Sequence, residues 1–283
     1  MISFLLYLLL DFVRNDGTTQ DVAACVCLVG CNLPAAEEPR RSACGTLSDG
    51  QIGACGMESL CKKHFRCVFC GKDFIDDVTV GSDAFPIQDS DFRMHSQGVQ
   101  AIQNNVHSCP FCGFTDELHE EKLQEEEKSE ILEHLVSHGF FGEGRKPFTP
   151  AQKYALLADI TILRNGSSME IAQVYLYAAW MAEDEADIEM GRRFRQQAEA
   201  YLVKALDNHE VDAERTPLIT YLVGELNRRL EKFEEAIVWF SRVKSKDLQL
   251  MELCKQQKFF ASVKESVNTR MPTEPDRTCW IPV

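Results

Sequence analysis

The chain has 283 residues, of which 45% are hydrophobic, so we expect a folded protein with one large domain or two smaller ones. Its formal charge of −14 at pH 7 repels phosphate backbones, which argues against a nucleic-acid partner. The arrangement of the 12 cysteines in a chain this long favours metal thiolates in a reducing cytoplasm over a secreted disulfide scaffold.

The first segment, residues 1–56, shows no sustained helical or strand periodicity and is interrupted by prolines and glycines. It opens with MISFLLYLLL, an apolar run about half as long as a membrane span and with no positive residue ahead of it. We therefore expect neither export nor a membrane anchor. Two interpretations stay open: the natural protein begins at Met57, or residues 1–56 are a flexible N-terminal extension.

Residues 57–118 contain two copies of the motif CxxCG and are predicted to form a zinc-ribbon-like β domain. Zinc takes four ligands in a tetrahedron, and two cysteines separated by two residues reach one ion from a tight turn. The glycine after each pair permits the positive φ that such a turn often needs. The motifs therefore predict one structural zinc ion in a closed site, with no open position for chemistry, held by Cys67, Cys70, Cys109 and Cys112.

Two other uses of these cysteines remain open: iron in a rubredoxin-like site, and a dithiol redox pair. Cys61, His64 and His107 lie near the motifs, but four thiols already complete a site, so we expect these three outside the ligand set. Short strands are expected at 76–80 and 106–108, with a turn at Asp89–Phe92.

Residues 119–148 are predicted to form an acidic linker helix and a hinge. The stretch Asp116–Glu133 carries nine acidic residues and two lysines, so repulsion between like charges makes a helix there marginal and solvated. His134 and His138 are spaced i,i+4 but lack a third ligand nearby, and we interpret them as surface residues. Residues 139–146 lack the Gly-Lys-Ser/Thr ending of a phosphate loop, which leaves a hinge as the interpretation.

Residues 149–267 are predicted to form five or six antiparallel helices, with a tail at 268–283. Thr149-Pro150 and Thr216-Pro217 each offer a cap followed by proline at the first helical position. Ser167 and Glu170 have the spacing of a capping box.

Two of the predicted helix pairs have the pattern of tetratricopeptide repeats. In the later pair, Gly224 stands where the first helix must approach the second, Ala236 follows twelve residues on, and Phe240 four further. Small residues at a helix crossing with an aromatic beyond it allow close packing. The alternative is an ordinary helical bundle with coincidental spacing.

Several motifs occur together in a characteristic order: CVFCG and CPFCG around a DSDF turn, then YAAWM, then YLVGELNRRLEKFEEAIVWFSRV. Over residues 65–246 the chain resembles the bacterial domain of unknown function 2225 family. The resemblance implies a cytosolic bacterial protein with a cysteine-rich head and a repeat-like tail, and it has no counterpart for residues 1–56. The expected fold is mostly α, with a small zinc-ribbon-like β head followed by an antiparallel helical-repeat domain.

Function is predicted from the surfaces that this fold would expose. Stacked repeats form a concave face suited to an extended peptide or a helix, which indicates a non-catalytic, zinc-stabilised protein-binding scaffold. Asn227, Arg228 and Arg229 would present positive charge to an acidic partner segment; alternatively these arginines pair with Glu225 and Glu231. The rival function is a thiol-based redox or metal-responsive switch at the two CxxC pairs. An enzyme is not expected, because no nucleophile elbow, complete phosphate loop or open metal site occurs.

Overall fold

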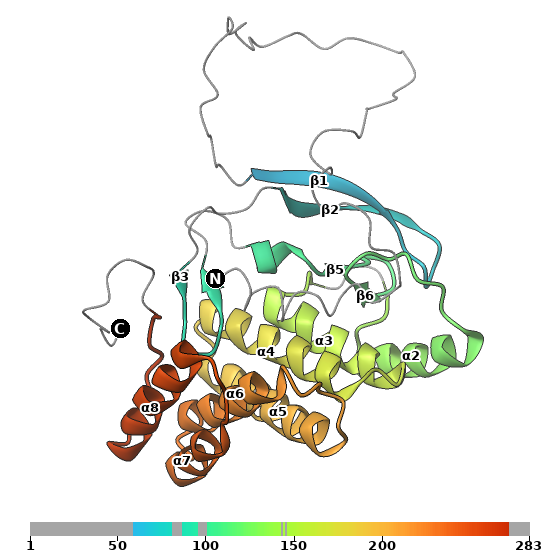
Figure 1. The fold of residues 1–283 in the computed structure, drawn as a ribbon. Coiled ribbons are helices and arrows are strands. Elements are labelled where there is room, and N and C mark those ends of the chain that lie inside the picture. Colours follow the sequence, from blue (N-terminus) through green and yellow to red (C-terminus); the bar gives the residue numbers. More distant parts are fainter. Residues whose placement is uncertain (1–58, 81–86, 96–100, 143, 145, 272–283) are drawn as a thin grey trace, which may run out of the picture. The chain divides into compact units, whose positions relative to one another are not determined.

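The computed structural model describes residues 59–80, 87–95, 101–142, 144 and 146–271 (Figure 1). All of them belong to one compact unit, Gly56–Val283. The predicted segment 1–56 and most of the predicted tail, from 272 on, lie outside the described residues. In the described part of the chain, no helix combines the length and the hydrophobicity that crossing a membrane requires.

The head is built from three antiparallel strand pairs. Strand β1 (Ser59–Arg66) pairs with β2 (Asp73–Val80), from Ser59 opposite Val80 to Arg66 opposite Asp73. Two shorter pairs and one 3-10 turn complete it: β3 (Ile87–Gln88) with β4 (Met94–His95), β5 (His107–Ser108) with β6 (Thr115–Asp116), and η2 (Ala101–Asn104). The strands predicted at 76–80 and 106–108 and the turn at Asp89–Phe92 are confirmed.

The rest of the described chain is helical, and the predicted mostly α fold with a small β head is confirmed. Each helix from α3 onward packs against the next one along the chain, and α6 also contacts α8. Whether this succession is a true tetratricopeptide repeat stays a prediction. The helices are α2 (Glu125–Ser137), α3 (Pro150–Leu163), α4 (Ser168–Asp184), α5 (Ile188–Asp207), α6 (Thr216–Arg229), α7 (Phe233–Arg242) and α8 (Leu248–Ser262).

Two of the three predicted helix starts are confirmed. Thr149 caps α3 with Pro150 in the first turn, and Ser167 with Glu170 forms a capping box on α4. The predicted cap at Thr216 is wrong: Thr216 is the first residue of α6, and its amide donates to the carbonyl of Asp212 at 2.9 Å. The turn that begins at Asp212 therefore starts the helix one residue early.

The acidic helix differs from its prediction in both extent and role. It begins at Glu125 rather than near Asp116, because the preceding residues form β6 and an irregular connection. Its Ile131 and Leu135 are buried in the core of the head. One face of α2 is thus packed. In its acidic first turn, where carboxylates favour the helix dipole, Glu125 and Glu126 are exposed, while Glu127 lies 3.4 Å from Arg164 at the end of α3.

Gly224 lies where α6 crosses α7, as predicted. A methyl group at this position would come within 2.8 Å of the ring of Phe240, closer than carbon atoms tolerate. We expect Gly224→Ala to lower the free energy of unfolding by about 1–3 kcal/mol through overpacking, measured by urea titration with tryptophan fluorescence.

Gly191 in α5 offers a matched control for this substitution. Its nearest neighbour would be the carbonyl oxygen of Ala179, at an ordinary 3.5 Å. Gly191→Ala should be neutral or stabilise by up to about 1 kcal/mol, since alanine favours the helix. Equal destabilisation by both substitutions would contradict the close crossing at Gly224.

Candidate metal centre

The two CxxCG motifs occupy equivalent turns at the ends of two hairpins. The first joins β1 to β2, and the amides of Cys67 and Gly71 donate to Lys72 O and Cys67 O at 3.0 and 2.8 Å. The second joins β5 to β6, and the amides of Cys109 and Gly113 donate to Phe114 O and Cys109 O at 2.8 and 2.9 Å. Both glycines have positive φ, 72° and 84°, as the motif required.

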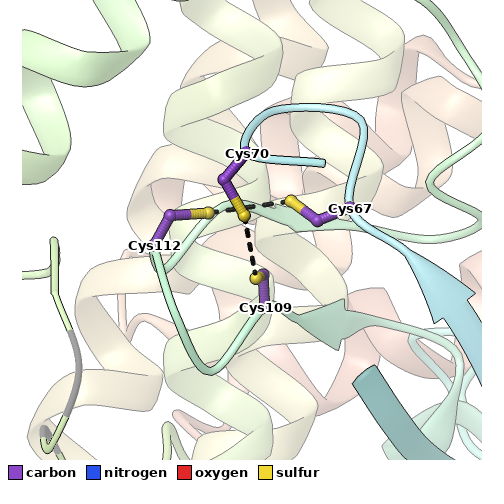
Figure 2. Close-up of side chains that lie close together, drawn as sticks. All are labelled: Cys67, Cys70, Cys109 and Cys112. Atoms are coloured by element: carbon purple, nitrogen blue, oxygen red, sulfur yellow. Dashed lines mark hydrogen bonds between the residues drawn. The ribbon is translucent and has the colours of Figure 1, made fainter. Parts of the chain in front are cut away.

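These turns bring all four sulfur atoms together, as Figure 2 shows. Every pair of sulfurs lies within 4.8 Å; Cys67 and Cys112 are 3.6 Å apart, and Cys70 and Cys109 are 3.7 Å apart. A tetrahedron with metal–sulfur bonds of about 2.3 Å has edges of about 3.8 Å. The donor set and its spacing therefore fit a four-coordinate thiolate metal site. Among the described residues no other group of three or more metal-binding side chains gathers in this way.

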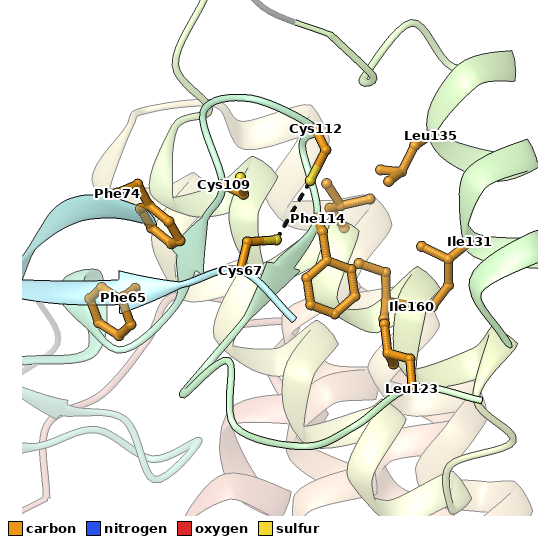
Figure 3. Close-up of a cluster of buried hydrophobic side chains, with 11 residues drawn as sticks. Phe65, Cys67, Phe74, Cys109, Cys112, Phe114, Leu123, Ile131, Leu135 and Ile160 are labelled. Carbon is orange, nitrogen blue, oxygen red and sulfur yellow. Dashed lines mark hydrogen bonds between the residues drawn. The ribbon is translucent and has the colours of Figure 1, made fainter. Parts of the chain in front are cut away.

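The cysteines also form part of a hydrophobic core that joins the head to the helices (Figure 3). Aromatic residues of the strands pack on one side of them, and aliphatic residues of α2 and α3 on the other. The members other than the cysteines are Phe65, Phe74, Phe114, Leu123, Ile131, Leu135, Leu156 and Ile160. Cys67, Cys109 and Cys112 are buried, whereas Cys70 is partly exposed. An ion at this point would fix the strands against the helices.

Electrostatics within the cluster favours a cation. Hydrogen bonds from the Cys112 and Cys67 thiols hold the pKa of Cys109 far below its ordinary value. The Cys67 and Cys112 thiols keep their protons in return: their hydrogen bonds with Cys109 raise the pKa of Cys67 to about 12 and raise that of Cys112 strongly. Without a positive ion, the Cys109 thiolate thus disfavours ionisation of the Cys67 and Cys112 thiols. Four thiolates in this space require a cation to neutralise them.

Cys61, His64 and His107, the residues near the motifs, are not part of the four-cysteine cluster. Cys61 and His64 are exposed on β1. His107 is buried, but its Nδ1 lies 3.0 Å from Asp76 Oδ2, and its ring packs on Phe65 with centroids 4.2 Å apart. His119, which sequence analysis did not single out, is buried against the same core, and its Nε2 lies 2.8 Å from His107 O. These imidazoles support the strands around the cluster.

The other predicted histidine pair is not gathered into a site. His138 is exposed, as expected of a surface residue, and its Nδ1 lies 2.9 Å from the carbonyl oxygen of His134. His134 is partly buried, with Nε2 at 3.3 Å from Asp159 Oδ2 on α3. His134 therefore belongs to the contact between α2 and α3, and the surface interpretation holds for His138 alone.

Asp76 ties the head to the helices by charge. Its Oδ2 lies 3.0 Å from His107 Nδ1 on β5 and 3.1 Å from Lys153 Nζ on α3. Burial opposes ionisation of this carboxyl, but the hydrogen bond from His107 and the charge of Lys153 outweigh it and lower the pKa from 3.8 to about 2. Because the pKa of Asp76 is lower in the folded protein than in the unfolded chain, its ionised carboxylate stabilises the fold above pH 4. That contribution is lost as the pH falls toward 2.

We expect Asp76→Asn to lower the free energy of unfolding by about 1–3 kcal/mol, as for other charge-assisted hydrogen bonds. The penalty should be equal at pH 5 and pH 7, because Asp76 is ionised at both, and urea titration at the two pH values measures it. The neighbouring Asp77 pairs with Lys62 at 3.2 Å in solvent, so Asp77→Asn should have no measurable effect. Similar penalties for the two substitutions would contradict the assignment.

Asn227, Arg228 and Arg229, predicted to bind a partner, have their side chains inside the protein. Arg228 is fully buried and donates to both carboxylate oxygens of Glu225, at 2.9 and 2.6 Å. Arg229 donates to Glu183 Oε1 at 2.6 Å, and Asn227 to the carbonyl of Val223 at 2.8 Å. The pairing of Arg228 with Glu225 is the alternative that the sequence left open. The partner-binding role of these residues stays a prediction, and their burial lends it no support.

Sequence reasoning missed the polar residues of the DSDF turn, which are buried among the helices. Asp91 accepts the indole N–H of Trp180 at 3.0 Å and lies 3.5 Å from Arg229. Arg93, the residue that follows the turn, donates to Asp184 Oδ1 at 2.6 Å. The signal was present, because the DSDF and YAAWM motifs were recognised separately, but nothing in the sequence paired Asp91 with Trp180.

A family model with the description "Uncharacterized protein conserved in bacteria (DUF2225)" matches residues 60–265. That range contains both CxxCG motifs and all of the described α-helices, from α2 to α8, which ends at Ser262. Comparison with curated proteins and with solved structures gives no match.

Proposed function

This chain belongs to the bacterial DUF2225 family, and we propose that it is a non-catalytic scaffold in which one zinc ion stabilises the head and the helical region binds a protein partner. One observation carries the proposal: four cysteine sulfurs within 4.8 Å of one another, inside the core that joins strands to helices. Cys67, Cys70, Cys109 and Cys112 would hold the ion. Reduced thiols suit the bacterial cytoplasm, where we place the protein.

The donor set supports a structural role for the ion. Four protein ligands close a zinc site, whereas catalytic zinc keeps a position for water or substrate. Iron accepts the same tetrahedral thiolate geometry, so the choice of zinc rests on its prevalence in paired CxxC sites of this kind. Zinc would supply charge compensation and geometry here, with no redox chemistry of its own.

The helical region supports the partner-binding part of the proposal. Successive helices that pack each on the next leave an extended surface, which is how helical-repeat proteins hold peptides and helices. We propose a protein or peptide partner on this ground. An acidic partner is not carried forward, because Arg228 and Arg229 are paired with carboxylates inside the protein.

A thiol-based switch is the second candidate, and one observation favours it. Cys70 is partly exposed while the other three cysteines are buried, so an oxidant has one sulfur to attack. Oxidation at Cys70 would remove a ligand and release the ion.

Metal analysis during mild oxidation separates these candidates. The purified protein is treated with a small excess of hydrogen peroxide while zinc release and free thiols are counted. The scaffold proposal expects one zinc per chain that stays bound while exposed thiols such as Cys61 react. Zinc released in step with reversible loss of four thiols would favour the switch, and a protein purified without zinc would refute the structural centre.

A further inference from the structure

The segment after α8 pairs by its backbone with the residues at the end of β3. Asp89 and Arg270 form an antiparallel bridge. Beside it, the amide of Ser90 donates to Thr269 O and the amide of Met271 to Gln88 O, both at 2.7 Å. We call Glu265–Met271 the strap. Its backbone thus pairs, through one isolated bridge and two flanking hydrogen bonds, with the end of β3, almost 180 residues earlier in the sequence.

Two adjacent side chains of the strap are recognised individually. Asn268 donates from Nδ2 to Asp89 Oδ2 at 2.8 Å, and its Oδ1 lies 3.0 Å from Ser90 Oγ. Thr269 accepts at Oγ1 from Gln257 Nε2 at 2.9 Å. The DSDF turn therefore binds the side-chain amide of Asn268, and α8 binds the hydroxyl of Thr269, the next residue.

The buried ion pair of α6 holds the start of the strap. Arg228 Nη1 donates to Glu265 O at 2.7 Å and to Val267 O at 3.0 Å. Glu225 binds the other nitrogens of the same guanidinium, and its Oε1 also lies 2.7 Å from Ser90 Oγ. The guanidinium is therefore fixed in place as a double donor for an extended backbone. We call Asp89, Ser90, Arg228 and Gln257 the strap site.

Hydrogen bonds, rather than apolar burial, hold the strap. Thr269 is its one buried residue, while Val267 is 43% exposed and Arg270 is also exposed. Segments with few buried apolar contacts open at a lower free energy than the whole fold. The strap-site residues, by contrast, are buried in α6, α8 and the DSDF turn.

We propose that the strap site is a strand-addition site for an extended partner segment with an amide side chain followed by a hydroxyl, and that the strap is its ligand in cis. Strand addition of this kind gives affinity through the backbone and specificity through side chains. The tether gives the strap a high effective concentration, so a partner segment binds only by displacing it. This inference rests on the proposed scaffold function and defines the chemistry of its partner.

Peptide binding to the full-length chain tests the proposal. The ligand is a fluorescent synthetic peptide, KESVNTRM, with the sequence of residues 264–271. The receptor is either the unchanged chain or the full chain with Asn268→Ala and Thr269→Val, which weaken the strap and leave the site intact. Anisotropy should show about tenfold tighter binding to the variant, because its own strap competes less. A peptide with the same two substitutions should bind the variant about tenfold more weakly.

Zinc content and far-UV circular dichroism are measured on the same samples. A folded, zinc-containing variant that does not bind KESVNTRM would overturn this inference while the metal-centre proposal stands. Dimers that form through the variant's strap would also overturn it, in favour of exchange between copies.

Hydrogen exchange on the unchanged chain provides a second measurement. It does not use the variant, so it tests the proposal even where the variant fails to fold. The proposal expects the amides of Thr269 and Met271 to exchange by local opening, faster than the amides of α6. Exchange of these amides only with global unfolding would overturn the proposal.

Discussion

Replacement of Cys112 by serine is expected to abolish metal binding and to unfold the strand-built head. Cys112 is buried, its sulfur lies 3.6 Å from that of Cys67, and among the described residues no cysteine beyond Cys67, Cys70 and Cys109 joins it in the cluster. Structural zinc sites contribute on the order of 10 kcal/mol or more to folding at neutral pH. Zinc per chain should fall from one to near zero, and amide exchange across β1, β2 and β5 should accelerate strongly.

Cys61→Ser is the matched control for this substitution. Cys61 lies in β1, is exposed, and stands six residues before Cys67. Its replacement should leave both zinc content and exchange unchanged. Tryptophan fluorescence is a poor readout of the head, because Trp180 and Trp239 lie in α4 and α7. Full zinc binding by Cys112→Ser, or equal loss in Cys61→Ser, would contradict the assigned ligand set.

The second large effect is expected at the buried ion pair between Glu225 and Arg228. Both side chains are 0% exposed, and Nη2 of Arg228 lies 2.6 Å from Oε1 of Glu225. Glu225→Gln keeps the shape but leaves a buried guanidinium without its counter-charge. We expect the free energy of unfolding to fall by about 3–5 kcal/mol, measured by urea titration.

Two comparisons isolate the effect of this pair. The double variant Glu225→Gln, Arg228→Met has no unpaired buried charge. Its loss of unfolding free energy should therefore be smaller than the sum of the losses in the two single variants. Glu252 and Lys255 have the same i,i+3 spacing on α8, but both side chains are 72% exposed. Glu252→Gln should have no measurable effect. A cost below about 1 kcal/mol for Glu225→Gln would contradict the buried-pair account.

The sequence was sufficient for the features that depend on local chemistry. The repeated CxxCG motif predicted both turns, because a tight turn fixes its own geometry within five residues. The gathering of the four cysteines, which spans 45 residues, was predicted from the four ligands that a tetrahedral metal site needs. Ser167 with Glu170 predicted a helix start for the same reason. Gly224 and Phe240 predicted a close helix crossing, since only glycine leaves room for that ring.

Features that depend on residues far apart in the chain were not predictable from the sequence. Arg228 and Glu225 are polar residues on a helix, and such residues normally face solvent. They are buried because the DSDF turn and the strap cover that face of α6, through contacts that span 135 residues from Ser90 to Glu225. The burial of Asp91 beside Trp180 has the same origin.

The most direct test of the central claim is X-ray absorption spectroscopy of the metal in the purified full-length protein. The account predicts zinc coordinated by four sulfurs at about 2.3 Å, with no nitrogen or oxygen ligand. That shell should be absent from the Cys112→Ser variant. Zinc bound by nitrogen or oxygen, or a protein whose four cysteines hold no metal at all, would contradict it.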